Sequence, residues 1–222
     1  MDEKSYILKT KSTTCILFYL AIVLVLVPIL FMTIKNVVDS TTLLQVILNV
    51  LSYLSLSVLY IIILRNYLFD DLKEFKKKIL LCILVIIGTI VVIKLSDQLF
   101  SMLYKAIGKD LGNNQNSIVS YIDEYPILML LSSVVFAPFV EEIVFRKNIF
   151  SFFKNDWIGL LISTLLFATI HVLSTFDFIH IFPYLFGGFF FSLAYVLSKR
   201  NIWVTIIAHS LINLISFLVL II

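Results

Sequence analysis

Charged residues are scarce in this sequence of 222 residues. Asp, Glu, Lys and Arg together make up 14% of it, whereas about 25% is usual for a soluble domain. Hydrophobic residues make up 61%, and the mean hydropathy is +1.07. A chain of this composition has too little polar surface to face water on all sides. The sequence therefore predicts an integral membrane protein with the lipid bilayer as its surroundings.

Cysteine is almost absent, and a dense basic region is missing. Cys15 and Cys82 both fall within apolar runs, where a free cysteine behaves as a small hydrophobe. They support neither a disulfide framework nor a cysteine metal site. The net charge of +3 comes without a basic patch interleaved with aromatic residues, so no nucleic-acid partner is expected. No small-residue cleavage site follows the first apolar run, which predicts an uncleaved span rather than a signal peptide.

Long apolar runs fill most of the chain, and a helical span needs about 20 apolar residues. We therefore expect an all-α fold, a polytopic transmembrane helical bundle of about seven spans that forms a single membrane domain over residues 1–222. The expected spans are Thr13–Met32, Thr42–Leu64, Ile79–Ile93 and four more that begin near Tyr125, Trp157, Phe178 and Ile202.

The connections between these runs differ in character. Residues 66–78 form a charged segment, and Ser96–Glu124 is the only long polar stretch. That stretch contains GKDLGNNQNS, which is typical of a loop. It also contains the amphipathic piece Leu99–Ile107, which is either an interfacial helix or part of an ordinary surface loop.

The distribution of Lys and Arg predicts the orientation. If the N-terminus is cytoplasmic, 13 of the 17 basic residues lie on the inner side, as the positive-inside rule requires. These residues are Lys4, Lys9, Lys11, Arg65, Lys73, Lys76, Lys77, Lys78, Arg146, Lys147, Lys154, Lys199 and Arg200. We expect a multi-pass protein of the cell membrane with its N-terminus in the cytoplasm and its C-terminus outside.

Ionisable residues within a span cost about 2.5–3.5 kcal/mol each on insertion scales, so they are functional candidates. The first three expected spans have essentially none, whereas the fourth carries Glu141 and Glu142. Adjacent carboxylates project about 100° apart on a helix, which indicates different roles. Glu142 and Arg146 are four residues apart and can pair, whereas Glu141 is left as a candidate general base. Pro138 predicts a packing kink just before them.

Two histidines and one amide occur in the later spans. His171 ends the sequence FATIH, and His209 and Asn213 lie one turn apart in HSLIN. A lone histidine in an apolar helix is usually a core residue with a satisfied ring. Two histidines, an amide and two carboxylates together favour a functional site. His180, near the start of the sixth span, is interpreted as structural.

The depth of these residues sets a condition. If the fourth helix continues past Arg146 to a turn near Asn155, Glu141 and His171 share a level roughly 21 Å from that turn. His209 is roughly 12 Å past the next inner turn, so the levels agree if the first hairpin projects about 9 Å further into the cytoplasm. The sequence then predicts one cluster of Glu141, His171, His209 and Asn213.

The three motifs EEIVFR, FATIH and HSLIN, in this order, resemble those of the CAAX-protease and bacteriocin-processing family of intramembrane endopeptidases, also called the CPBP or Abi family. The stretch from Gly187 through IWVTIIAHSLIN adds to the resemblance, which covers about residues 125–215. Each motif alone is weak, but three in order, each in a span, are a strong signal. The first three spans carry no motif of this family.

The resemblance implies an endopeptidase that cleaves a membrane-associated peptide, either prenylated or of leader type. It implies that Glu141 activates a water molecule with the help of His171. His209 and Asn213 would hold the developing oxyanion, which is usually the largest electrostatic contribution to such catalysis. Glu142 would orient the site, as would Arg146. The expected partners are a peptide or protein substrate at the membrane and the lipid bilayer.

The resemblance leaves the cofactor open, because proteins of this family are often described as metalloproteases. A zinc ion, if present, would be held by Glu141, His171 and His209, a ligand set that suits zinc. Asn213 is a poor zinc ligand, and the HExxH helix of soluble zinc proteases is absent from the sequence. The residues slightly favour a metal-free glutamate mechanism.

Two other functions fit the same residues. One is a non-proteolytic bacteriocin-immunity protein or a partner-binding membrane scaffold of the same fold. The other is a transporter or channel in which Glu141 and His171 relay protons or ions. Against the transporter, the polar residues form one cluster rather than a line through all spans, and the sequence shows no inverted repeat.

Overall fold

The computed structural model describes residues 3–109, 112–173 and 175–221, and the regular structure within these ranges is helical. Seven helical segments in them are long and apolar enough to cross a membrane. They are Ser5–Ile34, Thr41–Lys77, Ile79–Ala106, Pro126–Ser151, Asp156–Leu173, Phe178–Leu197 and Ile202–Ile221. The predicted all-α fold with seven spans is confirmed, and the chain is a multi-pass membrane protein.

Some of these spans consist of several elements. The first span consists of α1 (Glu3–Tyr19), the π-helical η1 (Leu20–Leu26) and α2 (Val27–Ile34). The second span is α3 (Thr41–Lys77) and the third is α4 (Ile79–Ala106). The helix α5 (Asn113–Glu124) lies between the third and fourth spans in the chain. The fourth span is α6 (Pro126–Leu130), η2 (Leu131–Phe136), α7 (Ala137–Glu142), η3 (Ile143–Asn148) and α8 (Ile149–Ser151). The last three spans are α9 (Asp156–Leu173), η4 (Phe178–His180) with α10 (Ile181–Leu197), and α11 (Ile202–Ile221).

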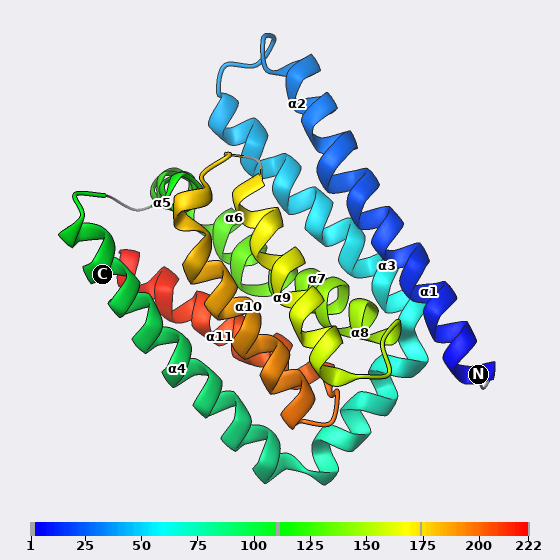
Figure 1. Ribbon diagram of the computed structural model, residues 1–222. Helices are drawn as coiled ribbons and strands as arrows, with labels where there is room; N and C mark the ends of the chain where they lie inside the picture. Colours follow the sequence, from blue (N-terminus) through cyan, green and yellow to red (C-terminus); the bar gives the residue numbers. More distant parts are fainter. Residues whose placement is uncertain (1–2, 110–111, 174, 222) are drawn as a thin grey trace.

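The spans form a bundle with α1 and α3 along one flank and α4 along the other (Figure 1). Between them, α10 packs against both α9 and α4, and α11 packs against α4 and α7. The α3–α4 junction, the α8–α9 turn and the α10–α11 turn lie at the same end of the bundle as the N-terminus (Figure 1). This is the end at which the sequence places most of its Lys and Arg residues.

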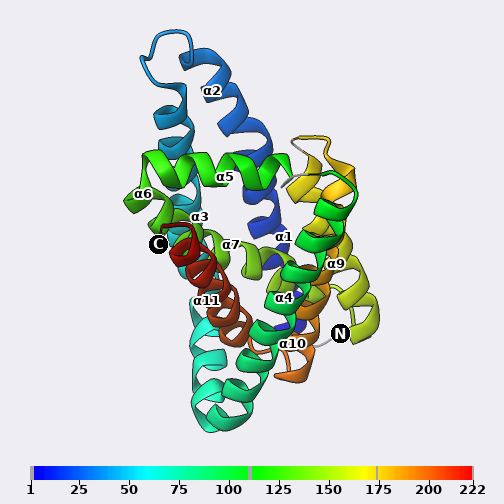
Figure 2. The ribbon, with the colours of Figure 1, turned by 90° about the vertical axis from the view of Figure 1, so that its left-hand side faces the viewer.

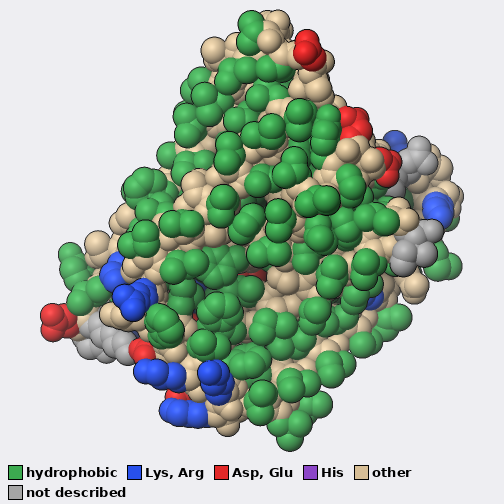
Figure 3. Space-filling model, turned by 180° about the vertical axis from the view of Figure 1, so that it is seen from behind, with side chains coloured by type: hydrophobic (Ala, Val, Ile, Leu, Met, Phe, Trp, Pro, Cys, Tyr) green, Lys and Arg blue, Asp and Glu red, His purple; other side chains and the backbone are tan. Residues whose placement is uncertain are grey.

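The outer faces of the spans are apolar. Seen from behind, hydrophobic side chains cover most of the molecule, and Lys and Arg gather mainly at the lower left (Figure 3). Among the exposed side chains are Ile62 and Leu80, which are 69% and 70% exposed. A broad apolar surface of this kind is what a bilayer covers and what water disfavours.

Several helices are longer than the sequence predicts. α1 begins at Glu3 rather than Thr13, and α3 continues through the charged segment to Lys77. That segment contains neither Gly nor Pro, and its Lys, Glu and Leu residues are good helix formers. α4 runs past Ile93 to Ala106, so the amphipathic piece is the end of a span rather than an interfacial helix or a loop.

The end of α4 has a well-defined cap. Gly108 has a φ of +69°, its N–H donates to the carbonyl of Lys105, and the N–H of Lys109 donates to that of Tyr104. This is a Schellman motif, in which a glycine takes the left-handed conformation that ends a helix.

The expected loop after α4 contains a helix, so that part of the prediction was wrong. α5 runs across the bundle at a steep angle to the spans (Figure 2). Its apolar residue Ile122 is buried against Val46 of α3 and Met129 of α6. Loop-like composition did not prevent helix formation because these tertiary contacts stabilise the helix.

A polar network joins three helices at the basic end of the bundle. The Asp71 carboxylate accepts hydrogen bonds from Nζ of Lys147 at 2.5 Å and from the N–H of Ile202 at 3.3 Å. Asn201 donates from its amide to the carbonyl of Asp71 at 2.6 Å. The end of α3 therefore fixes both the fourth span and the start of α11, the two elements that carry Glu141 and His209.

Replacement of this carboxylate tests the network. Asp71→Ala leaves the buried ammonium of Lys147 without its partner, and we expect a loss of about 2–3 kcal/mol in the free energy of unfolding. Lys76→Ala, at an exposed position five residues further along α3, serves as the control. Thermal unfolding of both variants in the same detergent should show a lower Tm for Asp71→Ala alone, and equal Tm values would contradict the proposed stabilisation.

Candidate active site

The backbone of the fourth span is irregular around its two glutamates. The π-helical segments η2 and η3 flank α7 on both sides, and the N–H of Ala137 donates to the carbonyl of Ser132, five residues back. Pro138, where the sequence predicts a kink, follows directly and has no N–H to donate. Both Glu141 and Glu142 are buried, although neighbours on a helix point in different directions. π-Helical turns of this kind are frequent at functional sites.

The condition set by the sequence is met. The fourth span continues past Arg146 to Ser151, and α9 begins at Asp156. Glu141 and His171 consequently face each other, with 3.8 Å between Oε2 and Nε2. That distance is too long for a direct hydrogen bond.

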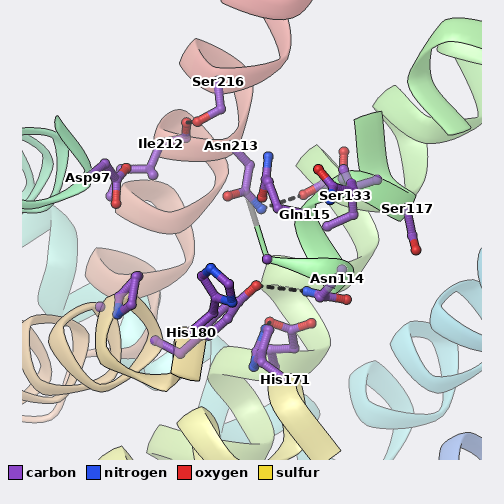
Figure 4. A pocket seen from close by; sticks show the side chains of 18 of the residues that line it. Asp97, Asn114, Gln115, Ser117, Ser133, His171, His180, Ile212, Asn213 and Ser216 are labelled. Carbon is purple, nitrogen blue, oxygen red and sulfur yellow. Dashed lines mark hydrogen bonds and ion pairs between the residues drawn. The ribbon is translucent and has the colours of Figure 1, made fainter. Parts of the chain in front are cut away.

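The four residues predicted to form the site line one cavity. Its volume is about 1620 Å³ and its lining includes Glu141, His171, His209 and Asn213. In Figure 4, Asn213 of α11 approaches Ser133 of the fourth span, while His171 of α9 lies further along the same pocket. The amide of Asn213 donates to the carbonyl of Ser133 at 2.8 Å, which leaves its second N–H and its oxygen for the cavity.

Glu141 and His171 are each held by a hydrogen bond. Tyr53 of α3 donates from its hydroxyl to Oε1 of Glu141 at 3.0 Å. Nδ1 of His171 lies 2.7 Å from the carbonyl of Phe167. Because a carbonyl can only accept, Nδ1 carries the hydrogen. In the neutral ring, Nε2 then presents its lone pair toward Glu141. The ring also stacks on Tyr184, with 4.7 Å between centroids.

Glu142 serves a different set of partners. Its Oε1 accepts from Arg146 at 3.1 Å and from Nδ1 of His209 at 2.8 Å. Both Glu142 and Arg146 are completely buried, and neither is among the residues that line the cavity. The predicted Glu142–Arg146 pair is confirmed. The structure adds that His209 bonds to Glu142 rather than to Glu141.

An aromatic frame surrounds this ion pair. The guanidinium carbon of Arg146 lies 4.4 Å from the ring centroid of Phe167, and His209 stacks on Phe191 with 4.6 Å between centroids. Arg146 also donates to the carbonyl of Gly188 at 3.2 Å. A Cβ on Gly188 would lie 3.3 Å from the Thr164 backbone, so a glycine allows α10 to pack closely on α9.

His180 takes part in an anchor for α5. Asp177 accepts from the N–H of Asn113 at 2.9 Å and contacts Nδ1 of His180 at 2.8 Å. Two hydrogen bonds lower the pKa of the Asp177 carboxyl, and the one from the N–H of Asn113 has a larger effect than the one from His180. At the next residue of α5, Asn114 donates to the hydroxyl of Tyr184 at 3.0 Å. α5 is thereby tied to the segment that carries the stacking partner of His171.

Two residues at the site were not expected from the sequence, namely Tyr53 and Tyr184. Tyrosine gives little signal in an apolar run, because its ring fits the bilayer. One sign was available in α3, where Gln45, Asn49 and Tyr53 recur every four residues in the run LLQVILNVLSY. Polar residues at this spacing share one face of a helix.

The side chains do not fit the zinc site that the family resemblance allows. Over the described residues, no three His, Cys, Asp or Glu side chains come together in a way that would hold a metal ion. Glu141 and His171 form a pair, but His209 does not join them in a group of three. The ligand set Glu141, His171 and His209 is therefore not assembled among the described residues.

Comparison with known proteins agrees with the motifs. The sequence profile of the family described as type II CAAX prenyl endopeptidase Rce1-like matches residues 123–215. No solved structure matches the chain.

Three relatives illustrate the similarity. An uncharacterized protein of Mycoplasma capricolum is 34% identical over 169 residues, which is 71% of this chain and 49% of that protein. A candidate membrane peptidase of Bacillus subtilis, YdiL, is 37% identical over 48% of this chain and 42% of its own length. The membrane-embedded CAAX protease MroQ of Staphylococcus aureus is 34% identical over 48% of this chain and 44% of its own.

The match covers about half the length of each of these relatives. The resemblance that the three motifs predict is confirmed by the profile and by the names of the last two relatives. The chain belongs to the Rce1-like family of CAAX proteases and related membrane peptidases.

Proposed function

We propose that this protein is an intramembrane endopeptidase that cleaves a membrane-associated peptide, prenylated or of leader type, with a water molecule activated by Glu141. The observation that carries the proposal is the arrangement of Glu141 and His171, 3.8 Å apart in a cavity within the bundle. Two acceptor atoms at that separation suit one water molecule that donates a hydrogen to each.

The reaction follows from these positions. Glu141 takes a proton from the water while the oxygen forms a bond to the carbonyl carbon of the peptide. The carbonyl oxygen becomes an oxyanion, and the carbon–nitrogen bond then breaks. Glu141 returns its proton to the leaving nitrogen. Tyr53 holds Oε1, so that Oε2 is directed toward His171.

His209 and Asn213 are the proposed donors to the oxyanion. Asn213 has a second N–H beyond the one given to Ser133. Nδ1 of His209 bonds to Glu142, so this ring can donate from Nε2 only when it carries both protons. Glu142 and Arg146 then act as the support that fixes the His209 ring. No step in this scheme is routed through a metal ion.

We place the N-terminus in the cytoplasm of a cell-membrane protein, because the basic residues gather at one end of the bundle. A reporter enzyme that is active only outside the cytoplasm, fused after the last residue, should be active. The same reporter in the α3–α4 turn, next to Lys78, should be silent. Activity in the turn and silence at the C-terminus would reverse the orientation.

Replacement of the proposed base tests the function. Glu141→Gln keeps the size of the side chain but removes the proton acceptor, and we expect processing to fall by about 100-fold or more. The matched control is Glu124→Gln at the exposed end of α5. Mass spectrometry of membrane peptides from cells with each variant measures the loss and identifies the substrate. Unchanged peptides with Glu141→Gln would favour the non-proteolytic immunity or scaffold function.

Tyr53→Phe tests the positioning of the base. The variant removes a hydrogen bond to a charged group, worth about 1.5–3 kcal/mol, so we expect processing to slow by roughly 10- to 100-fold. Tyr60→Phe is the control, because Tyr60 lies on the same helix and its hydroxyl donates to the carbonyl of Cys15, away from the site. Equal rates for the two variants would show that Tyr53 does not position Glu141.

A further inference from the structure

One wall of the cavity is a row of polar residues on α3. Gln45, Asn49 and Tyr53 all line it, and their spacing of four residues puts them on one face of the helix. The row leads directly to the candidate base, since Tyr53 donates to Glu141. We call these three residues the α3 row.

The two amides of the α3 row have no assigned partner. Gln45 and Asn49 are half-buried, and no hydrogen bond to either side chain is found in the part of the chain that the structure describes. Each carries one acceptor and two donor hydrogens. In a membrane span, polar groups without a partner are costly. A ligand with both donors and acceptors would satisfy them.

The spacing of the row indicates what that ligand is. Four residues of helix rise about 6 Å, and two residues of an extended peptide span about 6.6 Å. Successive members of the row can therefore meet alternate residues along one edge of an extended chain. Such a chain needs these contacts, because its own backbone groups are unpaired within the bilayer.

The row lacks the charge that a lipid phosphate would select. Gln45, Asn49 and Tyr53 are neutral groups. Lys94, which lines the same cavity, is paired with Asp97 at 3.1 Å and donates to Ser216 at 2.8 Å. Lys105 and Lys109 also line the cavity, and both are exposed. Gln115 of α5 lies beside Asn213 in the same pocket (Figure 4). A neutral chain of amides fits the α3 row better than an anionic headgroup does.

We propose that Gln45 and Asn49 bind the backbone of the substrate peptide in an extended conformation and guide it to Glu141. This inference rests on the proposed function, and it adds that the peptide is recognised by its main chain. It predicts tolerance of different side chains along this part of the substrate.

Site-specific photo-crosslinking in native membranes tests the proposal. A benzophenone amino acid is placed at position 49 or 45 in the Glu141→Gln background, so that bound peptide is not turned over. Positions 47 and 51, on the opposite and more exposed face of α3, are the controls. We expect polypeptide adducts at positions 45 and 49, and lipid adducts at 47 and 51.

A second variant links capture to the amides. With the probe at position 49, Gln45→Leu should reduce polypeptide adducts by roughly tenfold, the value of one or two hydrogen bonds. Ile47→Leu should leave them unchanged. Adducts with lipid alone at positions 45 and 49, or capture that Gln45→Leu does not weaken, would overturn the inference.

The proposed function can fail separately. Polypeptide adducts that depend on Gln45, without any peptides that depend on Glu141, would support the binding row and overturn the proteolysis. Peptides that depend on Glu141, without adducts at 45 or 49, would support the proteolysis and overturn the row.

Discussion

A fully buried ion pair between Glu142 and Arg146 is the interaction on which the rest of the site depends. Arg146 belongs to the fourth span, donates to α10 at Gly188 and lies over Phe167 of α9. Glu142 accepts from His209 of α11. One pair therefore connects all of the last four spans. Removal of either charge would leave the other buried and unpaired, which typically costs about 3–5 kcal/mol.

This pair also explains how two adjacent glutamates serve different purposes. The charge of Glu142 is balanced within the protein, whereas Glu141 faces the cavity with a single tyrosine hydrogen bond and a histidine across a gap. The irregular turns η2 and η3 around α7 allow both side chains to be buried. The helix thus places a carboxylate that supports the fold next to the carboxylate that we propose as the general base.

The sequence predicted the seven spans and the meeting of Glu141 with His171, because both follow from the cost of polar groups in a bilayer. Long apolar runs indicated the seven helices, and the depth argument brought Glu141 level with His171. The sequence did not predict α5, because the stability of this helix comes from tertiary contacts rather than from its composition. Nor did it assign Glu142 to His209, since the direction of each glutamate depends on π-helical turns. The α3 row was not predicted, because the search for site residues relied on ionisable side chains within the spans, whereas amides and tyrosine are neutral.

The central claim is that Glu141 acts as the base whereas Glu142 stabilises the fold. It is tested most directly by measuring thermal unfolding and peptide processing for both Glu141→Gln and Glu142→Gln. We expect Glu141→Gln to reduce processing by about 100-fold or more and to keep the Tm of the unaltered protein. We expect Glu142→Gln to lower the Tm, because Arg146 loses its partner. Processing by Glu141→Gln at the normal rate, or an equal fall in Tm for both variants, would contradict this claim.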